Sequence, residues 1–240
     1  MNYLTDELPF SNQERSLDIK ARTAKREHLI NHVTRVVLAD DHARVRRGIR
    51  NLLENADDIK VVGEAGNGLE ALNLVKKLKP DVLLLDMEMP VMNGNQVARE
   101  LKKNTSSVRV LALSAHDDQE YIKGMLNSGA AGYLTKDEAP YVLLQAVRGV
   151  ARGESGWVSQ RIARKLARSI PPIKLRPSAF SEREIKILQM LAEHHSEVEI
   201  AEELNIDHAS LQNQIETLFK KLEARTRLEL IVRAVKENLI

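Results

Sequence analysis

Apolar residues follow two different patterns along the chain, and the change between them divides the chain in two. Between residues 35 and 151, short apolar runs alternate with stretches of helical spacing. The runs predict five strands, and the stretches that follow them predict five helices. From residue 181 onward only the helical spacing continues. We therefore expect an α/β domain followed by a smaller domain made of helices alone.

The first domain is predicted to contain a parallel sheet covered by helices on both faces. The helix after the fourth strand is marked by Ile122, Met125 and Leu126. Because ligands bind such sheets beyond the carboxyl ends of the strands, the residues at those ends are the first candidates for chemistry. The expected strands are residues 35–40, 60–64, 82–85, 108–113 and 130–134.

The second domain is predicted from signals that begin helices. Ser181-Glu-Arg-Glu184 and Ser196-Glu-Val-Glu199 have the spacing of capping boxes, and Asp207 is a favourable N-cap for a helix that runs to about Leu222. A short helix, a tight turn at 205–207 and a longer helix are typical of a helix-turn-helix unit.

Charge is distributed unevenly, although the net charge of the whole chain is only +2. Residues 152–177 hold 7 basic residues and 1 acidic residue, whereas residues 178–240 hold 8 basic and 12 acidic residues. The basic segment also contains three prolines and a short helix predicted from Ser159 to Arg168, which is typical of a linker. We expect a mobile extension over 1–33, domains over 34–151 and 178–240, and this linker between them.

Composition excludes several classes of protein. The chain has no cysteine, so disulfides, thiolate zinc sites and iron–sulfur clusters are excluded. No apolar run is long enough for a membrane span, and Asp6 and Glu7 stand where a secretory signal needs apolar residues. Aromatic residues make up only 3%, which argues against a stacking surface for single-stranded nucleic acid. We expect a cytoplasmic protein without a membrane partner.

Polar residues stand at the carboxyl ends of four predicted strands. Asp40 and Asp41 end the first strand, Asp86 the third and Ser114 the fourth, and Lys136 follows the fifth. Two carboxylates about 4 Å apart repel by about 4 kcal/mol at an effective dielectric constant of 20, so three in one cleft favour a bound cation. Oxygen ligands alone suit Mg²⁺. A carboxylate beside Mg²⁺ and an ammonium group is placed to attack a phosphoryl group.

The same residues carry a resemblance to a known family. The motifs resemble the receiver domain of bacterial response regulators of the NarL/FixJ type, which implies a flavodoxin-like fold over residues 35–151. The resemblance implies that Asp86 accepts phosphate from a sensor histidine kinase. The motifs are Leu38-Ala-Asp-Asp-His-Ala-Arg-Val-Arg-Arg-Gly48, Asp86-Met-Glu-Met-Pro-Val-Met-Asn-Gly94, Leu113-Ser-Ala115 and Gly129-Ala-Ala-Gly-Tyr-Leu-Thr-Lys-Asp137.

The resemblance also implies roles for the neighbours of Asp86. Mg²⁺ would be bound by Asp41, by Asp86 and by the backbone carbonyl of Glu88, with Asp40 contacting it through water. Ser114 and Lys136 would hold the phosphoryl oxygens. Tyr133 matches the aromatic residue that turns inward when the hydroxyl residue moves.

Residues 179–238 resemble a LuxR-type DNA-binding domain, and receiver followed by LuxR-type domain is itself the NarL/FixJ arrangement. This implies a transcription regulator, not an enzyme, that dimerises on phosphorylation and binds double-stranded DNA. The candidate DNA contacts are Ser210, Gln212, Asn213, Thr217, Lys220, Lys221, Arg225 and Arg227.

Some residues depart from the family pattern. Gln212 and Gln214 stand where relatives usually have Lys and His, and Glu216 points a carboxylate at a polyanion. Together with the acidic balance of residues 178–240, these changes predict weaker non-specific DNA binding than the family norm. His194-His195 stands where the family usually has a glycine ending a helix, and we expect a helix-end role there and not a metal site.

Two other functions compete with the transcription regulator. The helical domain is alternatively a unit that has kept its core and binds a protein partner in place of DNA. Asp86-Met-Glu88 also has the acid spacing of phosphohydrolases with an aspartate nucleophile, but Met89-Pro90 replaces the small residue and threonine that follow in those enzymes.

Overall fold

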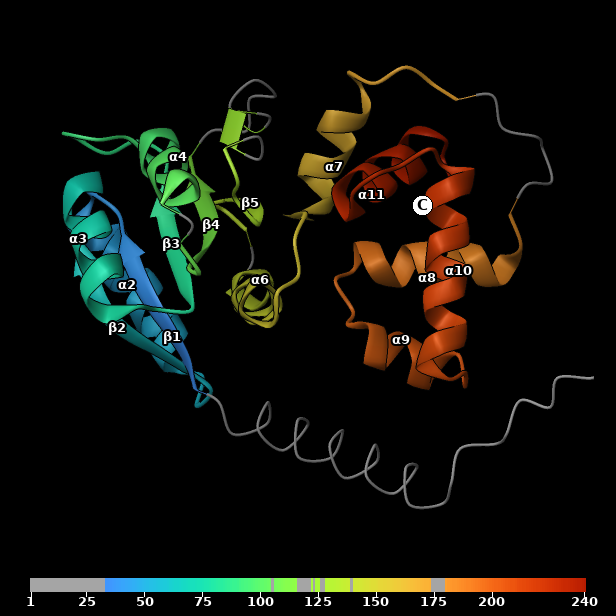
Figure 1. The fold of residues 1–240 in the computed structure, drawn as a ribbon, viewed down its shortest axis with the longest axis horizontal. Helices are drawn as coiled ribbons and strands as arrows, with labels where there is room; N and C mark the ends of the chain where they lie inside the picture. Colours follow the sequence, from blue (N-terminus) through green and yellow to red (C-terminus); the bar gives the residue numbers. More distant parts are fainter. Residues whose placement is uncertain are drawn as a thin grey trace, which may run out of the picture. The chain divides into compact units, whose positions relative to one another are not determined.

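The described strands all lie between Thr34 and Val158, most of them followed by a helix, and only helices come after them (Figure 1). The computed structural model describes residues 33–104, 106–115, 122, 124–125, 128–138, 140–173 and 180–240. Most of the predicted N-terminal extension and most of the fourth predicted helix lie outside these residues. The alternating part contains β1 (Thr34–Ala39), α2 (Ala43–Glu54), β2 (Ile59–Ala65), α3 (Gly68–Leu78), β3 (Val82–Asp86), α4 (Gly94–Lys103), β4 (Arg109–Ser114), β5 (Gly132–Thr135), α6 (Pro140–Arg152) and β6 (Trp157–Val158).

The sheet is parallel throughout, with strand order β2-β1-β3-β4-β5-β6. The described residues therefore form six strands where the sequence predicts five. The additional strand, β6, consists of two residues that pair with β5, Gly132 opposite Trp157 and Tyr133 opposite Val158. A two-residue strand is too short to show a strand pattern, so these residues were expected to belong to the linker.

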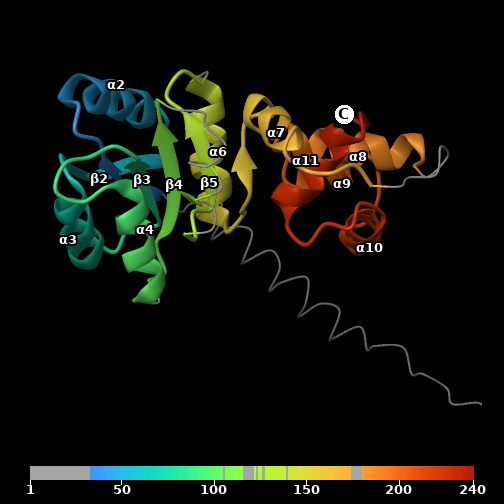
Figure 2. The same cartoon turned by 90° about the horizontal axis from the view of Figure 1, so that it is seen from above.

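Helices cover both faces of the sheet (Figure 2). Helices α2 and α6 lie on one face, and α3 and α4 lie on the other. Each face has its own apolar cluster: Leu38 and Leu84 belong to the first, and Val37 and Leu83 to the second. Because β3 is buried on both faces, its five residues are all enclosed up to and including Asp86.

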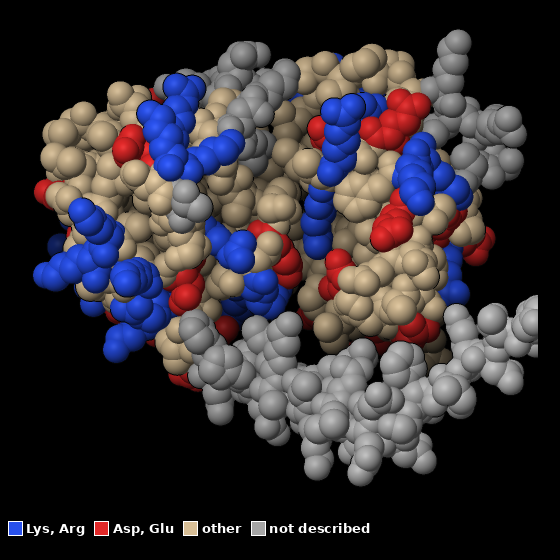
Figure 3. Space-filling model, viewed as in Figure 1, with Lys and Arg blue, Asp and Glu red and all other residues tan. Residues whose placement is uncertain are grey.

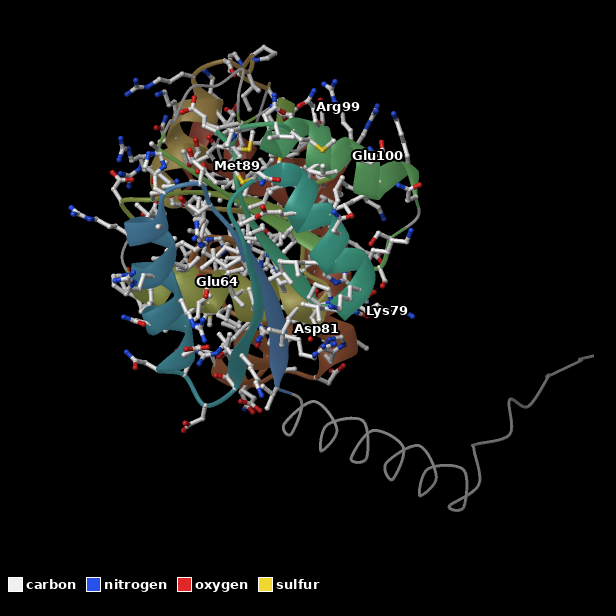
Figure 4. All side chains as sticks on the ribbon, turned by 90° about the vertical axis from the view of Figure 1, so that its left-hand side faces the viewer. Glu64, Lys79, Asp81, Met89, Arg99 and Glu100 are labelled. Atoms are coloured by element: carbon white, nitrogen blue, oxygen red, sulfur yellow. The ribbon has the colours of Figure 1, made fainter. Side chains whose placement is uncertain are left out.

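The carboxyl ends of the strands share one edge of the sheet. Asp81 precedes β3 and Met89 follows it, and Figure 4 shows these two labelled residues at opposite ends of the sheet. At the Asp81 end, its carboxylate accepts a hydrogen bond from the backbone N–H of Arg35 at 2.8 Å. The edge near Met89 therefore holds the residues that end β1, β3 and β4.

The helical part begins each helix with a side-chain cap. Ser181 and Ser196 form the predicted capping boxes with Glu184 and Glu199, and Asp207 accepts from the backbone N–H three residues later. These caps satisfy backbone donors that a helix start leaves without partners. The helices are α7 (Gln160–Ala167), α8 (Glu182–Ala192), α9 (Glu197–Glu203), α10 (His208–Lys221) and α11 (Arg227–Lys236).

Leucine and isoleucine side chains of α8, α10 and α11 form the core of this helical part, with Leu188, Leu211 and Leu230 fully enclosed. Helix α7, predicted as part of the linker, packs against α11 through its apolar face. No helix among the described residues is long and apolar enough to cross a lipid bilayer.

Trp157 in β6 is almost completely buried because two neighbouring residues lack side chains. A Cβ atom at Gly149 or Gly132 would come within 2.6 Å of Trp157 atoms, so glycine is required at both positions. On its other side, Trp157 stacks on His194, with ring centroids 3.9 Å apart. Nε2–H of His194 donates to the carbonyl of Val158 at 3.0 Å.

His194 lies in the turn after α8 with a positive φ of 66°. This backbone conformation is the one that usually ends a helix with glycine, so the expected helix-end role is confirmed. Here the side chain also attaches the turn to β6. The price of a non-glycine residue in this conformation is offset by the stacked ring and its hydrogen bond.

The pKa of His194 leads to a prediction about acid stability. Burial, together with nearby Arg227 and His195, lowers this pKa from 6.5 to about 4. Between these two values the unfolded chain binds a proton that the folded chain does not, so the contribution to stability is full above pH 6.5 and is lost as the pH falls toward 4. His194→Asn tolerates positive φ and does not titrate in this range.

We expect the free energy of unfolding of the unmodified protein to fall by about 2–3 kcal/mol more than that of His194→Asn on going from neutral pH to about pH 4.5. Urea unfolding followed by the emission of Trp157, the only tryptophan, measures both. Equal pH dependence in the two proteins would show that His194 titrates normally.

Candidate functional site

One ammonium group lies between two buried carboxylates at the carboxyl edge of the sheet. Nζ of Lys136 is 2.7 Å from Oδ2 of Asp40 and 2.7 Å from Oδ2 of Asp86. Asp40 follows β1 and Asp86 ends β3, and both are nearly inaccessible to water. The parallel pairing of β1 with β3 brings these two residues together, as the sequence predicts.

Burial and pairing shift the pKa values of this cluster. Burial raises the pKa of Asp86 above its ordinary value, although the hydrogen bond and charge of Lys136 oppose the shift. Burial alone would lower the pKa of Lys136, but its hydrogen bonds to Asp40 and Asp86 outweigh that effect and raise this pKa. Lys136 is therefore charged at neutral pH and is held where negative charge is concentrated.

Asp41 and His42 complete the cluster on its open side. Nδ1 of His42 is 2.6 Å from Oδ1 of Asp41. Ligand atoms of Asp40, Asp41, His42 and Asp86 lie within 4.8 Å of one another, and this is the one such group that the described residues bring together. His42 was not among the candidate site residues predicted from the sequence, although its position directly after two aspartates was a signal.

The carboxylates of this group fit Mg²⁺, which prefers oxygen ligands. One Lys136 leaves three carboxylates incompletely neutralised, so the site retains negative charge for a cation to balance. Beside Asp41 an open cavity of about 420 Å³ gives access from solvent, and it is lined by Asp41, Met87, Glu88, Met89, Pro90, Asn93 and Asn95.

The loop after β3 holds Asp86 in place through close backbone contacts. The backbone N–H of Glu88 donates to Oδ1 of Asp86 at 3.3 Å. The chain then returns so closely that a Cβ atom at Gly94 would lie 2.6 Å from the carbonyl oxygen of Asp86. Asn93 and Gln96 form a capping box that begins α4 directly after this loop. Only glycine fits at position 94, because the contact is with backbone that cannot move aside.

Ser114 lies on β4, the neighbour of β3, and Tyr133 lies on β5, the strand after it in the sheet; both side chains are fully buried. Ser114 ends β4, and its carbonyl accepts a hydrogen bond from the backbone N–H of Lys136 at 2.8 Å. Tyr133 lies in β5, three residues before Lys136. The sheet thus brings the ends of four strands, with the predicted hydroxyl and ammonium groups, to one edge.

The second candidate site is the solvent-facing side of α10. Leu211, Ile215 and Leu218 are buried on the opposite side of this helix. In Figure 3, acidic and basic side chains are interspersed over the face of the helical part that is drawn, without a continuous basic surface among its described residues. The exposed candidates for DNA contact are Gln212, Asn213, Thr217, Lys220 and Arg225.

Three other candidates for DNA contact have partners inside the protein. Ser210 donates to its N-cap, Asp207, at 2.5 Å. Nζ of Lys221 donates to both carboxylate oxygens of Glu184 at 2.7 and 2.8 Å. Arg227 donates to the carbonyl oxygens of Leu191 and His195 at 3.2 and 3.3 Å, next to the end of α8. All three groups stabilise the helical part. The partners of Lys221 and Arg227 are 30 or more residues away, which a sequence pattern does not reveal.

Comparisons with known proteins agree with the two-part organisation. A family model for the response regulator receiver domain matches residues 36–148. A second model, for bacterial regulatory proteins of the luxR family, matches residues 178–234. The first covers the residues around Asp86, and the second covers α8, α9, α10 and most of α11.

Similar proteins are known along most of the chain. Response regulator UvrY of Escherichia coli (strain K12) is 35% identical over 207 residues, which cover 85% of this chain and 94% of UvrY. The signal receiver domain of a putative response regulator NarL from Mycobacterium tuberculosis has a TM-score of 0.51 at 41% identity, covering 51% of this chain and 99% of that domain.

A second similar structure contains DNA. It is described as two RcsB dimers bound to two parallel DNAs, and it has a TM-score of 0.53 at 25% identity. The similarity covers 86% of this chain and 99% of that one.

The different surroundings of two adjacent lysines lead to a prediction. Lys221→Ala removes the ion pair with Glu184 and the contact with the Phe180 ring, 5.2 Å from Nζ, so we expect the helical part to lose about 1–2 kcal/mol of stability. Lys220→Ala, at an exposed position, should change stability by less than about 0.5 kcal/mol but weaken DNA binding. Thermal unfolding and DNA titration of both variants measure these effects, and equal stability would contradict the assigned role of Lys221.

Proposed function

The chain belongs to the two-component response regulators with a receiver domain and a LuxR-type DNA-binding domain, and from this premise we propose that phosphorylation of Asp86 controls its dimerisation and DNA binding. The proposed phosphate donor is a sensor histidine kinase. The observation that supports this most directly is Lys136 placed between Asp40 and Asp86 at the open edge of the sheet. Lys136 counters the negative charge that phosphate brings to a carboxylate.

In the proposed reaction an oxygen of the Asp86 carboxylate bonds to phosphorus while the bond between phosphorus and the donor breaks. Asp41, Asp86 and the backbone carbonyl of Glu88 would hold Mg²⁺, with Asp40 bound to it through water. Bound Mg²⁺ neutralises charge on the phosphoryl oxygens. Ser114 and Lys136 then hold these oxygens, since β4 is the neighbour of β3 and Nζ of Lys136 lies 2.7 Å from Oδ2 of Asp86.

The proposed output is DNA binding as a dimer that controls transcription. Residues 178–234 match a family of bacterial regulatory proteins, and the solved RcsB structure contains dimers on DNA. A helical domain that binds only a protein partner is not favoured by this match. The match over residues 36–148 likewise favours a receiver over a phosphohydrolase with an aspartate nucleophile.

The phospho-acceptor is tested by mass. With acetyl phosphate and Mg²⁺, the intact protein should gain the mass of one phosphoryl group, because Asp86 pairs with Lys136 and directly precedes Met87, which lines the cavity. Asp86→Asn should gain none, and removal of Mg²⁺ should prevent the gain in the unmodified protein. Asp57→Asn, which changes an exposed aspartate outside the cluster, is the control and should be labelled normally. Equal labelling of Asp86→Asn would refute the assignment.

Lys136 is tested by separating phosphorylation from its effect. A shift of a two-state equilibrium from 1:99 to 99:1 requires about 5.5 kcal/mol, and loss of a charged contact removes roughly 1.5–3 kcal/mol. Phosphorylated Lys136→Ala should therefore dimerise only in part, as measured by sedimentation. Lys103→Ala, an exposed lysine on α4, should dimerise like the unmodified protein. Complete dimerisation of Lys136→Ala would exclude Lys136 from the switch.

A further inference from the structure

Four polar side chains on the exposed side of α10 have no hydrogen bond or ion pair with the described residues. They are Gln212, Asn213, Glu216 and Lys220. All four lie away from the buried stripe of Leu211, Ile215 and Leu218, so they share the side of the helix that faces solvent. In a helix-turn-helix unit, the second helix enters the major groove with this side toward the bases.

Thr217, also exposed on this side of α10, presents its methyl group to solvent. The hydroxyl of Thr217 donates to the carbonyl of Asn213 at 2.9 Å, which satisfies its donor within the helix. The groups left for base edges are therefore two amides, one carboxylate and one ammonium group. An ammonium on a flexible stem suits phosphate, whereas amides and carboxylates suit bases.

Glu216 differs from three carboxylates of the helical part that serve its structure. Glu184 pairs with Lys221, Glu199 completes a capping box, and Glu229 accepts from the backbone N–H of Arg225. Glu216 has no such partner among the described residues. A carboxylate in the major groove is repelled by phosphates, and among base edges it is favourable only opposite an exocyclic amino group.

We propose that Glu216 is a specificity-determining residue that accepts a hydrogen bond from the N4 amino group of a cytosine in each DNA half-site. Gln212 and Asn213, one helical turn earlier, present amides that suit adenine edges. This assignment rests on the proposed DNA binding by α10.

The carboxylate of Glu216 discriminates between bases by unfavourable contacts as well as by the hydrogen bond to cytosine. Guanine presents two acceptors at this edge and thymine presents one acceptor and a methyl group, so Glu216 meets repulsion or an unpaired contact there. The unfavourable contact lowers affinity for wrong sequences, which is how a repulsive element produces specificity. The expected discrimination at this position is roughly 5- to 150-fold, the range for one good base contact.

The experiment uses the full chain treated with acetyl phosphate and Mg²⁺, with selection from a pool of randomised duplexes. The unmodified protein should prefer cytosine at one position in each half-site. Glu216→Gln should change that preference to adenine, because glutamine pairs with the N6 and N7 groups of adenine. Glu216→Ala should remove the preference, while preferences at other positions persist in both variants.

Glu203→Gln is the matched control, because it removes the same charge from an exposed position on α9. It should raise affinity for every duplex without altering any base preference. If both Glu216 variants only raise affinity uniformly and the cytosine preference stays, the assignment is overturned while DNA binding stands. If the unmodified protein and all variants bind no duplex, DNA binding by this chain is overturned and the assignment falls with it.

Discussion

Lys136 between Asp40 and Asp86 is the interaction on which the receiver part depends. Two carboxylates about 4 Å apart repel by about 4 kcal/mol at an effective dielectric constant of 20, and both are buried here. The parallel sheet forces them together, because β1 and β3 are neighbours whose carboxyl ends meet at one edge. The ammonium group of Lys136 offsets the repulsion between Asp40 and Asp86, but one positive charge does not also neutralise Asp41. The site therefore keeps the negative charge that a divalent cation requires.

Strand β5, which precedes Lys136, pairs with β6, and β6 holds the turn between α8 and α9 through His194. Tyr133 of β5 lies opposite Val158 of β6, and the carbonyl of Val158 accepts the hydrogen bond from His194. Trp157, beside it in β6, stacks on the same histidine. A displacement of β5 would therefore disturb a contact made of one ring stack and one hydrogen bond, which is weak compared with the apolar cores on either side.

Sequence predicted the parts of the fold that depend on neighbouring residues. Asp40, Asp86 and Ser114 each end an apolar run, so a parallel sheet was expected to bring them to one edge. The helix caps at Ser181, Ser196 and Asp207 were predicted from residue types at and shortly after each helix start. β6 was not predictable, because two residues carry no pattern and Trp157 fits only where Gly132 and Gly149 leave space. The sequence also predicted too many basic side chains available to DNA. Lys221 and Arg227 have partners inside the protein that are more than 30 residues away in sequence, and no local pattern reveals such partners.

The use of these cations inside the protein changes how the helical part can recognise DNA. With Lys221 and Arg227 engaged, Lys220 and Arg225 are the candidates left on or after α10 for phosphate contact, in a segment with 12 acidic and 8 basic residues. Each phosphate contact adds to affinity for all sequences and to the salt dependence of binding. A unit with few such contacts binds random DNA weakly, so a larger share of its affinity must come from base edges. Contacts with base edges depend on the DNA sequence. The low positive charge of the helical part and the amide and carboxylate side chains of α10 therefore both favour selection between DNA sequences over high affinity for all of them.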